Sequence, residues 1–514
     1  MSQYNLIDEP WIPVIDMNGN RKELGIFDTL TSANELLRIE DPSPLVTASL
    51  YRFLLAVLYR ALEGPCDIDE AKEFFKNGLP EDKIKQYLEK WKLRFYLFDD
   101  TYPFGQIPGF KPKHWRSWTA IAAEHNADNA KVLFDHIDVS NAGSINCASA
   151  VRWLIATQTY VTSAGKSELS HTGTAPSAGS AMVVPMGKNL QDTLIYCLVP
   201  QNKDILKNDL PLWEREPESI ENLKKGIERH PSGFSDLYSW RSRSILLEKD
   251  MGSRVSRLAF ASGVEVSDSE LVDAMLAYII VEKKEKGKEA KIKKKISVHL
   301  SDKGIWRDFD SLLPDNSGLA PKVVENAISL TRNIPERYPA GMMVFGQKYN
   351  PLRPNLIFWR KEYFVLPKQA KENRFIRNDI RNQLKEVNDT ATVLYKACEI
   401  YSEEVIRHGD RKVEGKDLRN FIEQISSLPY YWSILEAKFH EVLRDYSKGK
   451  DPDDIHKDWL IGLRNAISDS WNLHRKSISG SDPWEVRAFV KADGIIGKAI
   501  KELNEKISIL KEAI

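Results

Sequence analysis

The feature that most constrains the fold is a run of apolar residues at helical spacing in the C-terminal part of the chain. From Ile380 onward, apolar residues recur at alternating intervals of four and three: Leu384, Val387, Ala391, Leu394, Cys398, Tyr401 and Val405. This spacing places them on one stripe of an α-helix. A second stripe of the same kind runs from Trp432 to Tyr446.

Two further helices have recognisable starts. Asp451-Pro452 and Asp482-Pro483 each combine a capping residue with a proline at the first helical position, and an apolar stripe follows each pair. Amphipathic helices joined by short polar segments bury their stripes against one another. The pattern therefore predicts a four-helix bundle over residues 373–514.

Residues 1–372 have a different character. Helical patterns alternate there with short β-rich runs, and Gly and Pro break the pattern often. Four runs are expected as strands, at residues 94–97, 181–185, 296–300 and 356–366. A length of 514 residues allows two to four domains. We expect an α+β protein with a large mixed α/β domain over residues 1–372, followed by the bundle; the pattern does not fix the topology of the larger domain.

Charge and cysteine content limit the classes of function. Lys plus Arg (73) balances Asp plus Glu (73), so a polyanion must be bound by local patches rather than by a global field. The four cysteines, Cys66, Cys147, Cys197 and Cys398, include no CxxC pair. Neither a disulfide scaffold nor a structural zinc site fits this spacing. Reduced thiols in a cytoplasmic protein are expected.

Membrane insertion and targeting are not expected. The first residues show neither a basic region nor an apolar core of the signal-peptide type. The longest apolar stretch, Leu45–Leu62, contains Arg52 and Arg60, and a membrane span needs about 20 apolar residues. We interpret it as a buried amphipathic helix.

The sequence offers no catalytic motif. The ten histidines are scattered, and HExxH, G-x-S-x-G, Walker A and dinucleotide fingerprints are absent. Asp135-His136-Ile137-Asp138 is more typical of a solvated loop than of a metal site. The acidic residues around His456 suit the first turn of a helix. No catalytic residue, metal or cofactor is predicted, and the protein is not expected to be an enzyme.

A lysine-rich segment points to nucleic acid. Between Lys283 and Lys295 there are eight lysines and only two glutamates. We expect a loop whose lysines, among them Lys283, Lys284, Lys286 and Lys288, contact phosphates without reading sequence. The alternative is an ordinary solvated charge run.

Three other segments have compositions suited to nucleic acid, although each could be an ordinary surface loop. Leu133-Phe134 stands alone in a polar stretch and could wedge against or stack on a base. In the small-residue segment 163–179, Gly165 and Gly179 permit close approach of the backbone to a ligand, and Lys166 adds a charge. Residues 347–355 resemble a hairpin turn stiffened by two prolines, and they contain Tyr349, Asn350, Leu352 and Arg353.

Several stretches together resemble a known family. They are Asn5–Val14, Arg94–Phe98 with Tyr102–Gln106, Val132–His136, Gly233–Trp240 and Ile305–Asp310. In these stretches the chain is similar to the CasA family, the large subunits of the type I-E CRISPR surveillance complex Cascade. The resemblance spans nearly the whole chain.

The resemblance implies a non-catalytic subunit that recognises the protospacer-adjacent motif in double-stranded DNA and promotes duplex opening. The implied partners are target DNA, crRNA, the backbone and small subunits of Cascade, and a helicase-nuclease recruited after target binding. This division of labour fits guide-directed recognition, in which protein reads a short flanking motif and base pairing reads sequence. The specific flanking motif is not predicted.

The resemblance also assigns roles to the four segments. Leu133 and Phe134 correspond to the tip of the family's flexible loop, and Gly165 and Lys166 correspond to its glycine loop. Lys283, Lys284, Lys286 and Lys288 fall where the family has a lysine finger. Tyr349, Asn350, Leu352 and Arg353 fall in its wedge hairpin.

Two departures qualify the match. The paired cysteines with which some members bind zinc are absent, and Pro351-Leu352-Arg353-Pro354 replaces the Asn-Gln-Ala of the familiar wedge. Wedging by Leu352 is expected, whereas hydrogen-bonded reading at this position is not. A metal-dependent nuclease and a purely structural scaffold subunit are the alternative functions.

Overall fold

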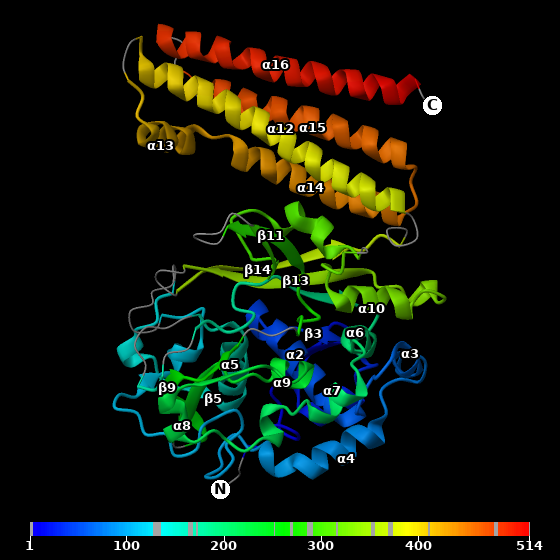
Figure 1. Ribbon diagram of the computed structural model, residues 1–514, viewed down its shortest axis with the longest axis vertical. Helices are drawn as coiled ribbons and strands as arrows, with labels where there is room; N and C mark the ends of the chain where they lie inside the picture. Colours follow the sequence, from blue (N-terminus) through cyan, green and yellow to red (C-terminus); the bar gives the residue numbers. More distant parts are fainter. Residues whose placement is uncertain are drawn as a thin grey trace. The chain divides into compact units, whose positions relative to one another are not determined.

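The computed structural model describes residues 4–126, 135–162, 168–170, 173–250, 252–267, 271–284, 291–314, 317–350, 355–368, 374–409, 412–476, 478 and 482–512. The chain forms two compact units (Figure 1). The first comprises Met1–Lys303 and Ser311–Tyr363, and the second comprises Gly304–Asp310 and Phe364–Ile514. Sheets and helices make up the first unit and long helices dominate the second, which confirms the predicted α+β class with C-terminal helices.

Helix α2 (Pro44–Leu62) is the core of the first unit. Ser43 caps it, because its Oγ accepts a hydrogen bond from the Val46 N–H, and Pro44 occupies the first turn. Helices α4 (Glu81–Trp91), α5 (Cys147–Tyr160) and α9 (Phe234–Tyr238) pack around it. The expectation of an amphipathic helix is wrong, because neighbours cover every side of α2 and nearly all of its residues are buried.

The two arginines of α2 are neutralised inside the protein. Arg52 pairs with Asp273, and Arg60 donates to both carboxylate oxygens of Glu214. By length and composition α2 could also cross a membrane, but 94% of its apolar window is buried within the protein. It is the one such helix in the described part of the chain, and this burial is what a core helix shows.

Three sheets and two ribbons complete the first unit. One sheet has the order β2-β1-β3, with β1 (Ile12–Asp16), β2 (Arg21–Leu24) and β3 (Leu36–Ile39). In the second sheet β9 pairs with all the others: β4 (Arg116–Ser117), β5 (Ile145–Asn146), β8 (Arg243–Lys249) and β9 (Arg254–Ser262). The third has the order β14-β13-β6, from β6 (Met182–Met186), β13 (Gly341–Tyr349) and β14 (Leu356–Val365).

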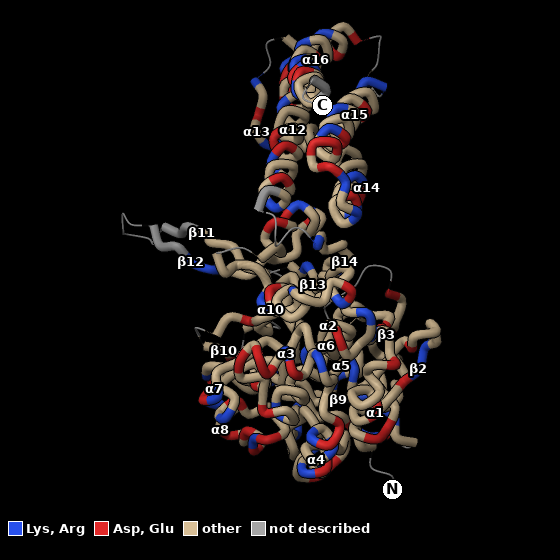
Figure 2. Tube along the Cα trace, turned by 90° about the vertical axis from the view of Figure 1, so that its right-hand side faces the viewer, with Lys and Arg blue, Asp and Glu red and all other residues tan. Residues whose placement is uncertain are grey.

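The ribbons are two-stranded. β7 (Ile227–Arg229) and β10 (Val264–Val266) run parallel, and β11 (Tyr278–Lys284) and β12 (Lys291–Ser297) run antiparallel. The described base of the β11–β12 ribbon extends outward from the first unit (Figure 2).

The strand predictions had mixed outcomes. Strands β6 and β14 confirm those at 181–185 and 356–366. The prediction at 94–97 is wrong: a 3₁₀ turn covers Lys92–Arg94, and Tyr96 forms only an isolated bridge. The prediction at 296–300 is confirmed in part, because β12 ends at Ser297 and His299 forms one further bridge. The lysine-rich segment was expected as a loop, yet its described ends are strands: β11 contains the β-branched run Ile279–Val281, and Ile292 and Ile296 stand among the lysines of β12.

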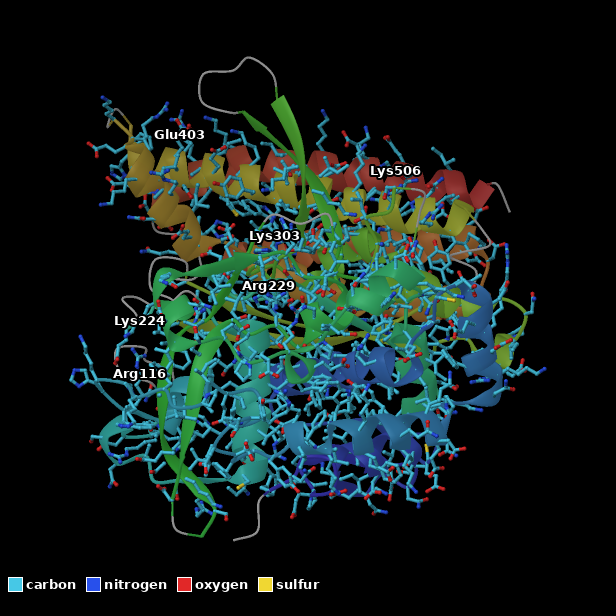
Figure 3. The ribbon with its side chains drawn as sticks, turned by 60° about the horizontal axis from the view of Figure 1, so that its bottom comes forward. Arg116, Lys224, Arg229, Lys303, Glu403 and Lys506 are labelled. Carbon is cyan, nitrogen blue, oxygen red and sulfur yellow. The ribbon has the colours of Figure 1, made fainter. Side chains whose placement is uncertain are left out.

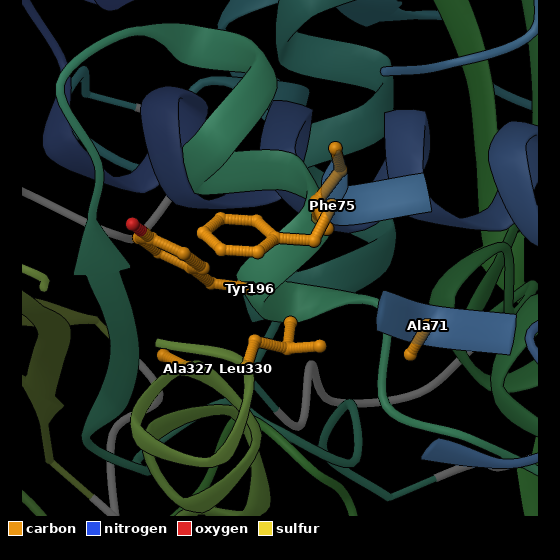
Figure 4. Packing of buried hydrophobic residues seen from close by; sticks show 6 residues of the cluster. Ala71, Phe75, Tyr196, Ala327 and Leu330 are labelled. Atoms are coloured by element: carbon orange, nitrogen blue, oxygen red, sulfur yellow. The ribbon is translucent and has the colours of Figure 1, made fainter. Parts of the chain in front are cut away.

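A smaller cluster of buried residues joins three further helices, α3 (Ile68–Asn77), α6 (Leu190–Cys197) and α10 (Lys322–Leu330) (Figure 4). The ring centroids of Phe75 and Tyr196 lie 5.7 Å apart within it. The Arg337 guanidinium covers the Phe75 ring at 3.6 Å and pairs with Asp192. The short helices α1 (Ile26–Thr31), α7 (Lys203–Asn208) and α8 (Ile220–Lys225) lie elsewhere in the unit.

The second unit is the predicted bundle. Its long helices are α12 (Arg374–Arg407), α14 (Leu428–Ser447), α15 (Pro452–Lys476) and α16 (Pro483–Glu512), and α12 packs against the other three. Both Asp-Pro starts are confirmed: Asp451 and Asp482 accept hydrogen bonds from backbone N–H groups two residues later. The sequence pattern did not separate the short helix α13 (Gly415–Ile425).

A short segment from far upstream completes the second unit. Trp306 and Phe309 are buried, and their rings lie 5.4 and 5.3 Å from that of Phe439. The Arg307 guanidinium lies 3.5 Å from the Trp432 ring centroid. Residues 364–368 also belong to this unit, so it begins before the boundary drawn at residue 373.

Candidate nucleic-acid interface

The structure describes some of the predicted site residues and the bases of the segments that hold the rest. Outside the described residues lie Leu133, Phe134, Gly165, Lys166, Lys286, Lys288, Leu352 and Arg353. The backbones of Lys283 and Lys284 end strand β11, and Tyr349 and Asn350 lie at the end of β13. The structure therefore shows how four segments are anchored at their ends: the one with Leu133 and Phe134, the one with Gly165 and Lys166, the lysine-rich segment and the β13–β14 hairpin.

The base of the segment 127–134 is closed by hydrogen bonds. The Asn126 backbone N–H donates to Asp135 Oδ2 at 2.5 Å, and the Asn126 side-chain amide donates to the Asp135 carbonyl at 2.8 Å. His125 Nδ1 lies 3.5 Å from Asp135 Oδ1. Burial raises the pKa of the Asp135 carboxyl, but hydrogen bonds from Asn126, Ile137 and His125 outweigh it, so the pKa is lowered. Asp135 thus holds the loop base as an acceptor.

A metal site at this place is not supported. In the described parts of the chain, no three His, Cys, Asp or Glu side chains are grouped so that they could hold an ion. The carboxylate of Asp135 already accepts hydrogen bonds from the backbone N–H groups of Asn126 and Ile137, and the His125 ring lies beside it.

Arg243 holds the start of the glycine-containing segment, residues 163–179. Its guanidinium donates to the carbonyl oxygen of Thr162 at 2.8 Å, directly before that segment, and to that of Gly173 at 3.0 Å, within it. Arg243 is only 2% exposed, and burial lowers its pKa to about 10. It therefore stays charged at neutral pH. Sequence reasoning missed this residue, because nothing in a single sequence distinguishes it from the other arginines.

The third sheet brings two segment bases together. Gly179 and Ala181, which end the glycine-containing segment, exchange backbone hydrogen bonds with Leu300 and Val298 just after β12. The next residues form β6, which pairs with β13 in the register Met182↔Phe345 to Met186↔Gly341. One hydrogen-bonded framework therefore connects the ends of three elements: the glycine-containing segment, the β11–β12 ribbon (the lysine ribbon) and the β13–β14 hairpin.

Gly179 lies at the junction of these elements. A Cβ on Gly179 would lie 3.0 Å from Nδ1 of His299 and 3.2 Å from Cε1 of Tyr349. Two rings, one from the end of the ribbon and one from the hairpin, thus approach a position that only a glycine fits without displacement. Burial lowers the pKa of His299. The sequence had indicated Tyr349 as a site residue and Gly179 as a position of close backbone approach, but not His299.

The β13–β14 hairpin has the base that the sequence predicted. The Asn350 N–H donates to the Asn355 carbonyl at 3.1 Å, so the described residues on either side of positions 351–354 are bonded to each other. Lys348 pairs with Asp302, and the Gln347 side chain donates to the Tyr160 carbonyl in the core. These two contacts hold the end of β13 to the rest of the first unit.

The register of the β11–β12 ribbon sorts its lysines into two faces. Lys284 is opposite Lys291, and Ile280 is opposite Lys295, so positions 284, 291, 293 and 295 share one face. Positions 283 and 294 fall on the other face, together with Ile279, Val281, Ile292 and Ile296. The base is anchored by Lys295, whose ammonium donates to the Gly318 carbonyl and lies 4.7 Å from the Tyr278 ring centroid.

Comparison with known proteins gives a consistent result. The family model of CRISPR-associated protein Cse1 matches residues 5–470. The CRISPR-associated protein CasA/Cse1 of Thermus thermophilus is 29% identical over 526 aligned residues, which cover 99% of each chain. The solved structure of Thermus thermophilus CasA (Cse1) superposes with a TM-score of 0.82 at 26% identity, covering 98% of this chain and 100% of that one.

The fold also occurs in a larger assembly. A chain in a solved CRISPR RNA-guided surveillance complex superposes with a TM-score of 0.75 at 17% identity, covering 96% of this chain and all of that chain (100%). At this identity the likeness shows a shared fold.

Proposed function

The chain belongs to the CRISPR-associated Cse1 (CasA) family, and on that premise we propose that it is the large subunit of a type I-E surveillance complex, Cascade. In this role it recognises the protospacer-adjacent motif in double-stranded DNA, promotes duplex opening and R-loop formation, and recruits the helicase-nuclease. Its partners are crRNA, target DNA and the backbone and small subunits of the complex. The protein acts in the cytoplasm.

The junction at Gly179 is the observation that best supports motif recognition. The glycine-containing segment and the β13–β14 hairpin leave adjacent strands of one sheet, and the lysine ribbon continues from the same place. Rigid strands that carry variable segments are the usual construction of a recognition site. Phosphate contacts from the ribbon would hold the duplex, while the backbone of the glycine-containing segment and the hairpin approach the groove.

The test is selection of flanking sequences. A complex assembled with crRNA is offered a duplex library randomised beside the target, with this chain, without it, and with Tyr349→Ala. Enrichment of a few flanking sequences that depends on the chain and weakens with Tyr349→Ala supports recognition. Tyr395→Ala, an exposed tyrosine of the second unit, is the control. Equal affinity for all flanks would make the chain a clamp or scaffold instead.

The nuclease alternative has a separate test. The purified chain is incubated with double-stranded DNA and Mg²⁺ or Mn²⁺, because a metal-dependent nuclease needs carboxylate or imidazole ligands for its ion. Accumulation of cleaved DNA that is abolished by a chelator would overturn the non-catalytic proposal. Intact DNA under conditions in which the assembled complex binds its target is the expected result.

A further inference from the structure

A short exposed segment of the first unit combines cations with an aromatic ring. Its residues 111–116 read Lys-Pro-Lys-His-Trp-Arg, and Lys111, Lys113 and His114 are exposed. Trp115 is 37% exposed, which is unusual for so large an apolar side chain. This segment has no part in the proposed recognition of the flanking motif.

The segment is held firmly at its start. Phe110, directly before it, is buried in one hydrophobic cluster with Leu169 and with Leu223 of α8. The backbone N–H groups of Lys113 and His114 both donate to the Glu168 carboxylate, at 2.8 and 3.4 Å. The exposed side chains therefore project from a fixed backbone.

Helix α8 adds a cation to the same surface. The Ser170 N–H donates to the Leu223 carbonyl at 3.2 Å, so residues 168–170 contact both α8 and the segment 111–116. Lys224 follows Leu223 directly and is exposed. Arg116 and Lys224 lie on the same side of the first unit in Figure 3.

The end of the segment is fixed by the second sheet. Arg116 is paired with Leu258 of β9, and its guanidinium lies 5.5 Å from the Phe260 ring centroid. Trp115 is thereby flanked by a fixed cation and by Lys113 two positions earlier.

The cations of this surface exceed the carboxylates that could neutralise them. Among the residues that the structure describes, Lys111, Lys113 and Lys224 form no ion pair. Glu168 accepts backbone hydrogen bonds and keeps its negative charge, and Glu221 pairs with Lys225, so the three lysines outnumber the one remaining carboxylate. A polyanion should therefore lie over residues 111–116.

We propose that residues 111–116, together with Lys224, bind single-stranded nucleic acid, with a base stacked on Trp115 and phosphates on Lys111, Lys113 and Arg116. An exposed ring among cations suits a single strand better than a duplex, because only unpaired bases present a free face for stacking. Such sites tolerate any base, since every base has that face. This site goes beyond the proposed motif recognition and does not depend on it.

The test uses the full chain alone with labelled oligo(dT) and oligo(U) of about 12 nucleotides, within the usual site size of such proteins. Binding is measured by fluorescence anisotropy over a range of salt concentrations. Trp115→Ala should weaken binding of both probes about fivefold or more, as expected for loss of one base stack, and leave the salt slope nearly unchanged. Lys111→Ala with Lys113→Ala should reduce the salt slope by up to about 1.4.

Matched variants separate the site from general effects. Trp359→Ala removes a tryptophan of similar exposure (39%), and Lys498→Ala with Lys501→Ala removes two exposed lysines from α16. Both should bind the probes like the unmodified chain, and Trp115→Phe should restore most of the binding. The proposal is overturned if the chain binds neither probe, if the control variants lose as much, or if Trp115→Ala weakens duplex binding equally. Because this experiment does not measure selection among flanking sequences, its failure would not affect the test of motif recognition.

Discussion

The guanidinium of Arg52 lies 2.5 Å from the carboxylate of Asp273 in the interior of the first unit, and both side chains are more than 90% buried. Asp273 also begins the chain segment that leads into the lysine ribbon: its N–H donates to the Tyr278 hydroxyl at 3.0 Å, and its carboxylate accepts from the Met275 N–H. The ion pair thus connects the core helix α2 to the base of a predicted DNA-contacting element.

Breaking this pair should be costly. Asp273→Asn keeps the shape and one acceptor but leaves the Arg52 charge buried without a counter-charge, which typically costs about 3–5 kcal/mol. Denaturant unfolding followed by circular dichroism measures the loss. Arg52→Met combined with Asp273→Asn should lose less than the sum of the two single variants. Additive losses would show that the two residues are not coupled.

Gly179→Ala should impair discrimination between flanking motifs. The added methyl group would meet the His299 ring at 3.0 Å and the Tyr349 ring at 3.2 Å, so at least one ring must move. We expect a several-fold loss of motif-dependent binding and a stability loss of about 1 kcal/mol or more. Flank selection by the assembled complex measures the first effect, and thermal unfolding measures the second.

The control for Gly179→Ala is Gly497→Ala in α16, where a methyl group meets no atom within 4 Å. An alanine there should stabilise the helix by roughly 0.5–1 kcal/mol and leave DNA binding unchanged. Unaltered discrimination in Gly179→Ala would remove the junction from the recognition site.

The two faces of the lysine ribbon should differ in their effect on DNA binding. Lys284 and Lys291 are cross-strand partners on the face that also holds positions 293 and 295. Lys284→Ala with Lys291→Ala should weaken all duplexes alike and reduce the salt slope by up to ~1.8, the value for two lost phosphate contacts. Lys283→Ala with Lys294→Ala removes the same charge from the other face and should have less effect. Equal losses would mean that only net charge matters.

The second unit should lose stability as the pH rises past neutral. His456 Nε2 donates a hydrogen bond to the Glu386 carboxylate at 3.2 Å, which raises the pKa of the imidazole despite its partial burial; the charge of Asp379 acts in the same direction and that of Lys506 against it. Because the pKa of His456 is higher in the folded state, its charged form stabilises the folded protein fully at pH values below the unfolded pKa of about 6.5. That stabilisation is lost as the pH rises through the folded-state pKa.

The comparison that isolates His456 is its replacement by glutamine. The difference in Tm between the unmodified chain and His456→Gln should be larger at about pH 5.5 than at about pH 8.5. A difference that does not change with pH would assign the imidazole a packing role alone.

The parts of the fold that were predicted are those in which one short stretch of sequence carries its own pattern. The apolar stripes and Asp-Pro starts of the bundle helices can be recognised within each helix, and two prolines within residues 347–355 indicate a hairpin turn. Helix α2 was placed correctly but misinterpreted as amphipathic. The burial of α2 on every side depends on helices from distant parts of the chain, α4, α5 and α9, and a local sequence pattern does not show them.

The candidate site was less predictable for the same reason. Arg243 reaches carbonyl groups 81 and 70 residues earlier in the chain, and Gly179 acquires its meaning only when His299 and Tyr349 pack beside it. The β-ribbon was not recognised in the lysine-rich segment, because lysines outnumber the β-branched residues on which a strand prediction depends, Ile279–Val281, Ile292 and Ile296. Sequence composition identified segments suited to nucleic acid, whereas tertiary contacts decide which of their residues share a face.

The segment 304–310 gives the strictest test of the two-unit organisation. Trp306 is 1% exposed and packs on Phe439 of α14, although the two lie more than a hundred residues apart in the chain. Trp306→Ala should therefore destabilise the second unit by about 3–5 kcal/mol. Leu473→Ala, at a position 48% exposed, should change stability by less than about 0.5 kcal/mol. A fragment that starts at Phe364 lacks Trp306 and Phe309, so we expect it to unfold at a lower temperature than the same unit within the full chain. If Trp306→Ala costs no more than Leu473→Ala, residues 304–310 are not an integral part of the bundle.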